Sequence, residues 1–218
     1  MTDLTLAALD SDGALQETAE KAGFDTRSDF FRKSMVAGGG LVAAGAFGGV
    51  VMPALAGAAT PKSDAAILNF ALTLEYLEAE FYKQAVAANF GGQTGAVANT
   101  IYKHEAAHVA YLKKALGKKA VKSPKFAFGK ATTDKDTFLA TAYVLENTGV
   151  QAYLGQVGKI KTPAILAAAA TILTIEARHA GAIALVTNKL IAPNGAFDKP
   201  KSKAAILKAV KGTGFIQS

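Results

Sequence analysis

A chain of 218 residues has room for one ordinary domain with a leader or tail, and little room for two full domains. Half of its residues are apolar, and none is cysteine, which excludes disulfides, thiolate zinc sites and rubredoxin-type iron centres; any metal must be held by carboxylates and imidazoles. The net charge is +7, and the prevalence of Ala and Leu over Val and Ile predicts an all-α fold.

Residues 1–59 differ in composition from the rest of the chain and are predicted to be an export signal. A polar segment ends in Thr26-Arg27-Ser28-Asp29-Phe30-Phe31-Arg32-Lys33, and an uncharged stretch rich in Gly and Ala follows and finishes near Ala54-Leu55-Ala56. This order is typical of a signal peptide with an Ala-x-Ala cleavage site, and the charged run resembles a twin-arginine signal in which Ser28 replaces the second arginine. A retained membrane anchor is the alternative, since about 25 uncharged residues can span a bilayer. We therefore expect an exported protein of the periplasm or cell envelope.

The chain beyond residue 59 is strongly basic, with 20 basic and 10 acidic residues. Nineteen of these cations are lysines, Arg178 is the one arginine, and no nucleic-acid-binding motif accompanies them. We expect no nucleic-acid partner. The lysines instead predict a solvated basic surface that faces an anionic membrane or cell wall.

Four long segments with helical periodicity follow the predicted signal. They are expected at residues 63–89, 94–116, 133–158 and 162–190. Thr133-x-x-Asp136 can form a capping box at the start of the third segment, and Thr162-Pro163 supplies an N-cap and first-turn proline for the fourth.

The lengths of the connections predict how these helices are arranged. Only a few residues join the first helix to the second and the third to the fourth, whereas residues 117–132 form a long link between the pairs. Two antiparallel hairpins joined by a long crossover make a four-helix bundle. We assign the bundle to residues 60–192 and expect the basic tail, residues 193–218, to pack on it.

The second pair of segments repeats the first at a constant offset of 71 residues. The repeat matches the polar residues on the apolar faces: Glu75 with Glu146, Tyr82 with Tyr153, Glu105 with Glu176 and His108 with His179. Duplication of a hairpin explains the matching apolar residues. It does not explain repeated ionisable residues on an apolar face, because an unpartnered carboxylate there is destabilising.

The repeated residues have the spacing of a dinuclear metal site. A Glu and a His three residues apart lie on the same side of a helix. Two such pairs, with one inward Glu from each of the other two helices, make the ligand set of di-iron and di-manganese bundles, and four carboxylates balance two divalent ions. We predict two iron ions, with manganese as the alternative, bound by six ligands: Glu75, Glu105, His108, Glu146, Glu176 and His179.

Other polar residues near this set are assigned less specific places. Glu78 is not expected to be a ligand, because Gly149 stands at the repeated position, and His104 is expected at the surface, because it lies off the apolar face. Tyr82 and Tyr153 follow a predicted ligand by two turns and are expected either to fill the core or to hydrogen-bond a ligand. No residue is assigned a catalytic role.

With Glu-x6-Tyr and Glu-x-x-His each present twice, the chain resembles the ferritin-like superfamily. Within it, the segment Leu68-Asn69-Phe70-Ala71-Leu72-Thr73-Leu74-Glu75-Tyr76-Leu77-Glu78-Ala79-Glu80-Phe81-Tyr82 and the later Gly195-Ala196-Phe197-Asp198-Lys199-Pro200 are similar to a ferritin-like domain family that includes exported bacterial proteins and plant desiccation-related proteins. The resemblance covers residues 60–218. It implies a di-iron or related site with the same six ligands, and it does not imply a settled reaction.

Two classes of function remain open. As an enzyme, the protein would be a ferroxidase or peroxidase that oxidises Fe(II) or reduces dioxygen or peroxide in stress protection, or a di-manganese catalase-like enzyme; without cysteine it needs an external electron donor. As a non-catalytic protein, it would be an iron-sequestering protein or a desiccation-stress structural protein in which the metal chiefly holds the bundle together. The oligomeric state is not predicted.

Overall fold

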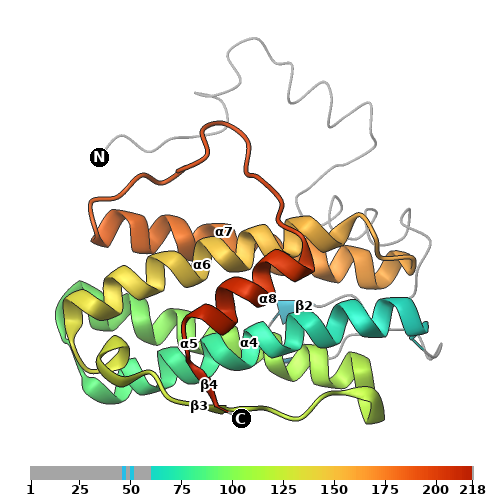
Figure 1. Ribbon diagram of the computed structural model, residues 1–218, viewed down its shortest axis with the longest axis horizontal. Coiled ribbons are helices and arrows are strands. Elements are labelled where there is room, and N and C mark those ends of the chain that lie inside the picture. Colours follow the sequence, from blue (N-terminus) through green and yellow to red (C-terminus); the bar gives the residue numbers. More distant parts are fainter. Residues whose placement is uncertain (1–45, 48–49, 52–59, 218) are drawn as a thin grey trace, which may run out of the picture. The chain divides into compact units, whose positions relative to one another are not determined.

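The computed structural model describes residues 46–47, 50–51 and 60–217 (Figure 1). The chain divides into two units, residues 1–56 and 57–218. In the first, the strands β1 (Ala46–Phe47) and β2 (Val50–Val51) pair antiparallel. The rest of the predicted export signal lies outside the described residues.

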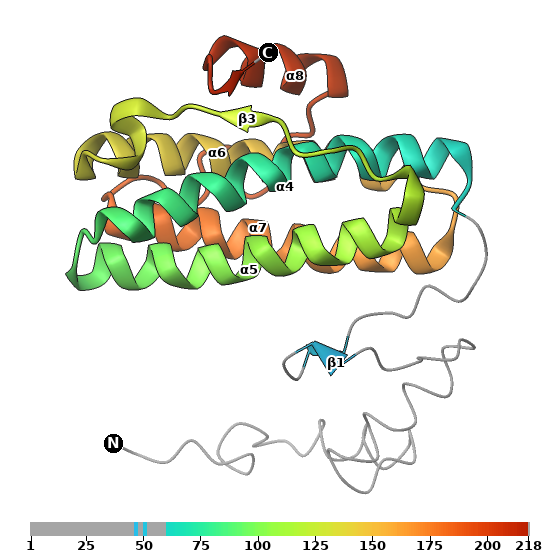
Figure 2. The ribbon, with the colours of Figure 1, turned by 90° about the horizontal axis from the view of Figure 1, so that it is seen from below.

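The second unit is built on four long helices. These are α4 (Lys62–Ala88), α5 (Gly92–Leu116), α6 (Lys135–Val157) and α7 (Pro163–Val186). Helices α4 and α5 form one hairpin and α6 and α7 the other; α4 also packs against α6, and α5 against α7 (Figure 2). The predicted all-α bundle of two hairpins is confirmed.

The second hairpin begins differently from the prediction. The N-cap of α6 is Asp134, whose carboxylate accepts a hydrogen bond from the backbone N–H of Thr137 at 2.9 Å, so the predicted capping box of Thr133 and Asp136 is wrong. Thr162 is the N-cap residue of α7 and Pro163 its first residue, as predicted, although the Thr162 side chain makes no capping hydrogen bond. Instead, the buried Asp64 carboxylate of α4 accepts the backbone N–H of Thr162 at 2.9 Å and so ties the two hairpins together at this end.

Helix α7 ends earlier than residue 190, because Asn188 has a left-handed φ of 52°. The following N–H of Lys189 reaches back to the carbonyl of Ala184 at 2.9 Å, which satisfies a terminal carbonyl of the helix as in a Schellman motif. Among the helices that the structure describes, α7 is the one that is long and apolar enough to cross a membrane by length and composition. A core helix of a bundle passes the same test, so this is weak evidence for a span.

The crossover and the C-terminal tail meet on one side of the bundle. The crossover contains two 3-10 turns, Gly117–Lys119 and Gly129–Thr132, and the strand β3 (Lys125–Phe126). The tail contains α8 (Lys203–Gly212) and β4 (Ile216–Gln217), which pairs antiparallel with β3. Helix α8 packs against α6 through side chains that include the fully buried Ile206, so the tail covers part of the bundle surface (Figure 1).

An aromatic cluster fixes α4 against α6 and the crossover. The ring of Phe81 stacks on that of Phe138, with centroids 5.3 Å apart, and meets the edges of Tyr82 and Phe128 at 5.2 and 5.4 Å. Phe81 and Phe138 are fully buried. Each such side chain contributes about 1.5–3 kcal/mol by leaving water, which keeps the polar residues one or two turns away in a fixed register.

Candidate metal centre

All six predicted ligands point into the middle of the bundle. Helices α4 and α6 each supply one carboxylate, and α5 and α7 each supply a Glu and a His one turn apart. The four glutamates are fully buried, and the two histidines are 4–7% exposed. These side chains are Glu75, Glu105, His108, Glu146, Glu176 and His179.

The ligand atoms form two overlapping groups, each with its atoms within 4.8 Å of one another. The first position contains Glu75 and His108, and the second position contains Glu146 and His179. Glu105 and Glu176 belong to both groups. A residue shared by two groups is placed to bridge two ions, whereas Glu75 and Glu146 can each serve one.

Both imidazoles present the same ring nitrogen to the carboxylates. Nδ1 of His108 lies 3.2 Å from Glu75, 3.4 Å from Glu105 and 3.3 Å from Glu176. Nδ1 of His179 lies 2.9 Å from Glu105 and 3.3 Å from Glu146. The two hairpins therefore direct the same ring nitrogen of their histidines toward the shared Glu105.

Most of these ligand atoms lack a hydrogen-bond partner among the described residues. Both carboxylate oxygens of Glu105, Glu146 and Glu176 are buried without one, as is Nδ1 of His179. A buried polar atom left unpaired is destabilising, and an ionised one more so. Divalent cations would supply the missing partners, and a set of carboxylates with neutral imidazoles suits iron or manganese.

Protons bound to these side chains offset part of the destabilisation. Burial raises the pKa of Glu75 to about 7, against the opposing effect of His108, and burial together with the charge of Glu105 raises the pKa of Glu176 well above its usual range. Burial favours neutral His179, but its close contacts with the carboxylates of Glu105 and Glu146 outweigh this effect and raise the pKa to about 10. Metal binding at this centre must therefore displace protons.

Hydrogen bonding crosses from one hairpin to the other at Tyr153. Its hydroxyl donates a short hydrogen bond to Oε1 of Glu75, not to Glu146 on its own helix. The equivalent Tyr82 is fully buried, and burial followed by the charge of the nearby Glu146 raises its pKa well above the usual range, but its hydroxyl makes no hydrogen bond within the described part of the chain. The two tyrosines thus differ in what they do beside equivalent carboxylates.

His104 contacts the centre, although the sequence predicts a surface position for it. Its side chain is exposed, as expected, yet its Nδ1 lies 2.9 Å from Nε2 of His179 and the two rings stack with centroids 5.1 Å apart. A partner on Nε2 fixes the tautomer that leaves Nδ1 free to bind metal. Ile175 occupies the repeated position, so His108 has no equivalent imidazole; repeat symmetry alone could not reveal this contact.

Glu78 is the second polar residue of the centre that the repeat conceals. It is 4% exposed, and its Oε1 lies close to Gly149, beside Oε2 of Glu176. One signal for it is in the sequence: Glu75 and Glu78 stand one turn apart on the same helix, opposite a residue without a side chain.

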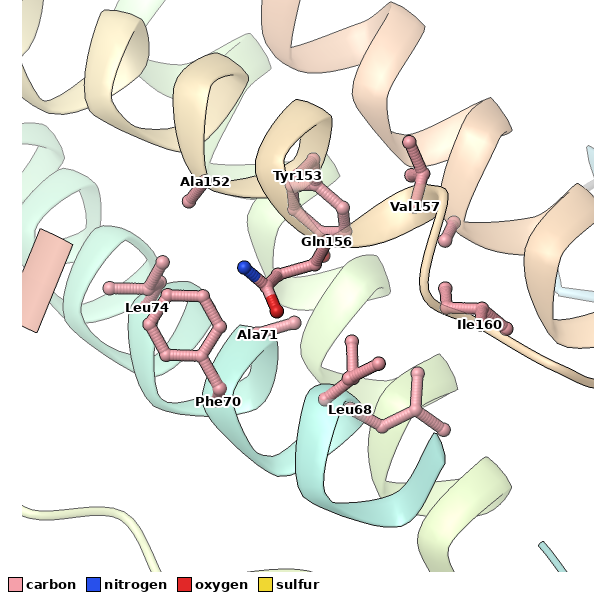
Figure 3. Close-up of a pocket in the computed structure, with 11 residues that line it drawn as sticks. Leu68, Phe70, Ala71, Leu74, Ala152, Tyr153, Gln156, Val157 and Ile160 are labelled. Carbon is pink, nitrogen blue, oxygen red and sulfur yellow. The ribbon is translucent and has the colours of Figure 1, made fainter. Parts of the chain in front are cut away.

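An apolar pocket adjoins the centre between α4 and α6, and the ring of Tyr153 forms part of its wall (Figure 3). The remaining lining includes Leu68, Ala71 and Leu74 from α4 and Ala152 from α6, and no lining residue is charged. Such a pocket favours small apolar molecules over ions. The pocket lies against Tyr153, the residue whose hydroxyl contacts Glu75.

A comparison with protein families gives a match over residues 63–189, more than half of the chain, to the family described as ferritin-like domain. The match spans all four long helices and ends just beyond α7. No curated protein matches the chain.

Proposed function

Because this chain belongs to the ferritin-like domain family, we propose that it binds two iron ions, or manganese in their place, between its four helices and uses them in redox chemistry. The ligands would be the six residues of the two positions, with Glu105 and Glu176 bridging. The redox role is oxidation of Fe(II), or reduction of peroxide or dioxygen, in protection against stress.

One observation carries this proposal: seven buried ligand atoms of Glu105, Glu146, Glu176 and His179 face one another without hydrogen-bond partners among the described residues. Four helices have to be held in register to bring these atoms together, and the metal-free arrangement is destabilising in itself. A cluster with this cost is expected where it serves a ligand. The balance of four carboxylates against two divalent ions supports a pair of cations as that ligand.

The chemistry needs two electrons at one place. A bound pair of iron ions would supply one electron each, so that peroxide could be reduced to water, or dioxygen to peroxide, with uptake of two protons. The protein's own residues would hold the pair and keep water out: Glu105 and Glu176 would contact both ions, Tyr153 orients Glu75, and the aromatic cluster around Phe81 closes the adjacent core. The apolar pocket beside Tyr153 is suited to the approach of dioxygen.

Elemental analysis of the purified protein, followed by stopped-flow mixing of anaerobic Fe(II)-loaded protein with dioxygen or peroxide, tests the proposal. We expect about two ions per chain and faster oxidation than iron in buffer alone. The double variant His108→Ala/His179→Ala removes one ligand from each position, and Glu80→Gln is the matched control on α4, since Glu80 forms an ion pair with Lys83 away from the centre.

Equal rates for the wild type and the double variant would exclude redox chemistry at this centre. If metal then raised thermal stability without turnover, iron sequestration or a structural role under stress would take its place. Manganese in the purified protein, with release of dioxygen from peroxide, would indicate catalase-like activity.

We further propose that the mature protein is exported to the periplasm or cell envelope and faces an anionic surface there. The composition of residues 1–59 and the excess of lysine in the remainder support this. N-terminal sequencing of the cell-envelope fraction is expected to start near residues 57–60. A protein that begins at Met1 would refute cleavage.

A further inference from the structure

Glu78 is the one acidic residue at the centre that the six-ligand set leaves without a role. It follows Glu75 by one turn on α4 and is 4% exposed. Burial and then the charges of neighbouring glutamates, first Glu176 and next Glu146, raise its pKa well above the usual range. A carboxyl held in this environment destabilises the metal-free bundle unless something offsets it.

Gly149 on α6 leaves the room that the Glu78 side chain uses. A Cβ atom at Gly149 would lie 2.8 Å from Oε2 of Glu176 and 3.4 Å from Oε1 of Glu78. Both oxygens are therefore close to one point, and a larger residue there would displace one of them. Because Gly149 is the repeat counterpart of Glu78, one hairpin supplies the extra carboxylate and the other supplies the space for it.

Resting on the proposed function, we propose that Glu78 is a fifth metal-directed carboxylate, which makes the two ion positions inequivalent by adding its charge to the position of Glu146 and His179. Gly149 lies one turn beyond Glu146 on α6, so the Glu78 head group, whose Oε1 is close to Gly149, lies near the helix that supplies the carboxylate of the second position.

The additional charge has a consequence for redox chemistry. Four carboxylates neutralise two divalent ions, so a fifth one leaves the cluster with one negative charge in excess. A pair of ions that has lost one electron carries one more positive charge, and this charge would neutralise the excess. Glu78 would therefore favour the oxidised form of the pair electrostatically.

The test is Mn(II) binding to the full-length protein by isothermal titration calorimetry. In Glu78→Gln we expect the affinity for one of the two ions to fall by about tenfold or more, which is the usual effect of losing a group that supports a metal site, while the other affinity is unchanged. Glu80→Gln on the same helix should behave as the wild type. Glu78→Asp keeps the charge but shortens the side chain by one methylene, and we expect it to weaken the same ion to a smaller extent.

The outcomes separate this inference from the proposed function. If the wild type binds no ion, the proposed function fails. If the wild type binds two ions and Glu78→Gln binds both with unchanged affinities, Glu78 is only a buried acid and the inference alone is wrong. Far-UV circular dichroism of the metal-free variants checks that they fold. If Glu78→Gln does not fold, Glu78→Asp is the test, and the inference is wrong if this variant binds both ions with wild-type affinity.

Discussion

Replacing Glu176 with Gln should remove most of the stability that metal gives to the bundle. Glu176 is fully buried and contributes ligand atoms to both positions. Glutamine has nearly the same volume, but it carries no charge and cannot bridge two cations. One substitution therefore weakens both positions without opening a cavity.

The expected size of the effect follows from binding linkage. An ion that binds only the folded state stabilises it by about 2.7 kcal/mol at a concentration about 100 times its dissociation constant. Two ions give about 5 kcal/mol, which raises the melting temperature of a domain of this size by roughly 10–20 °C. In Glu176→Gln we expect less than half of this rise. Since burial and the neighbouring Glu105 raise the pKa of Glu176 well above its usual range, the metal-free variant should be at least as stable as the metal-free wild type.

Thermal unfolding followed by far-UV circular dichroism, with and without Mn(II), measures both quantities in the wild type, Glu176→Gln and Glu80→Gln. The control variant should keep the full metal-dependent rise. An equal rise in Glu176→Gln would refute the bridging position of this residue. A metal-free Glu176→Gln protein that melts well below the wild type would instead show that the carboxyl stabilises the bundle on its own.

Three further predictions follow from the geometry of the centre. The melting temperature of the metal-free protein should fall as the pH rises from about 5 to about 9. The pKa of Glu75 is raised to about 7, so its contribution to folding stability becomes less favourable once the pH exceeds the pKa of Glu75 in the unfolded chain. The pKa of His179 is raised to about 10, so the stability that its protonated form contributes is lost as the pH rises above about 6.5. A constant or rising melting temperature in calorimetry would contradict this sign. His104→Ala should lower the affinity for one Mn(II) ion by about tenfold, because His179 loses the partner that fixes its tautomer; titration calorimetry that detects no change would show the contact to be incidental. Tyr153→Phe should weaken Mn(II) binding more than the matched change Tyr82→Phe, because only the Tyr153 hydroxyl donates a hydrogen bond to a ligand carboxylate; equal affinities in the two variants would count against that role.

The sequence predicts the bundle and the placement of the ligands for a physical reason. Helical period decides which residues share a face, and a duplicated hairpin places equivalent residues at equivalent heights. Glu75 and Glu146, which the offset pairs, accordingly take equivalent places in the two groups, each beside the shared Glu105 and Glu176. The C-terminal helix α8 is different: it is short, and its order depends on packing of Ile206 against α6, which a local pattern does not show.

The residues that the sequence misplaces depend on contacts between helices. Asp134 replaces the expected cap of α6, since either of two neighbouring polar residues could begin the helix and only the path of the crossover selects one. His104 lies off the apolar face, but a long imidazole at the edge of that face reaches His179 on the adjacent α7. The repeat that predicts the six ligands does not predict a role for Glu78, because the equivalent position is Gly149, which has no side chain to bind metal.

His104 and Glu78 depart from the repeat, and they make the surroundings of the two ion positions different although the hairpin is duplicated. Strict duplication would make the first and second positions equivalent, and two identical ions would then be held with equal affinity and equal charge compensation. Both polar departures lie beside the helices of the second position: His104 contacts His179 on α7, and Glu78 lies close to Gly149, one turn beyond Glu146 on α6. The first position instead has the hydrogen bond from Tyr153 to Glu75. One ion would thus meet more negative charge and a fixed imidazole, and the other ion a carboxylate that is held by the hydroxyl of a tyrosine. Because the two positions would then differ in affinity and in charge, the two ions would bind and change oxidation state in a defined order.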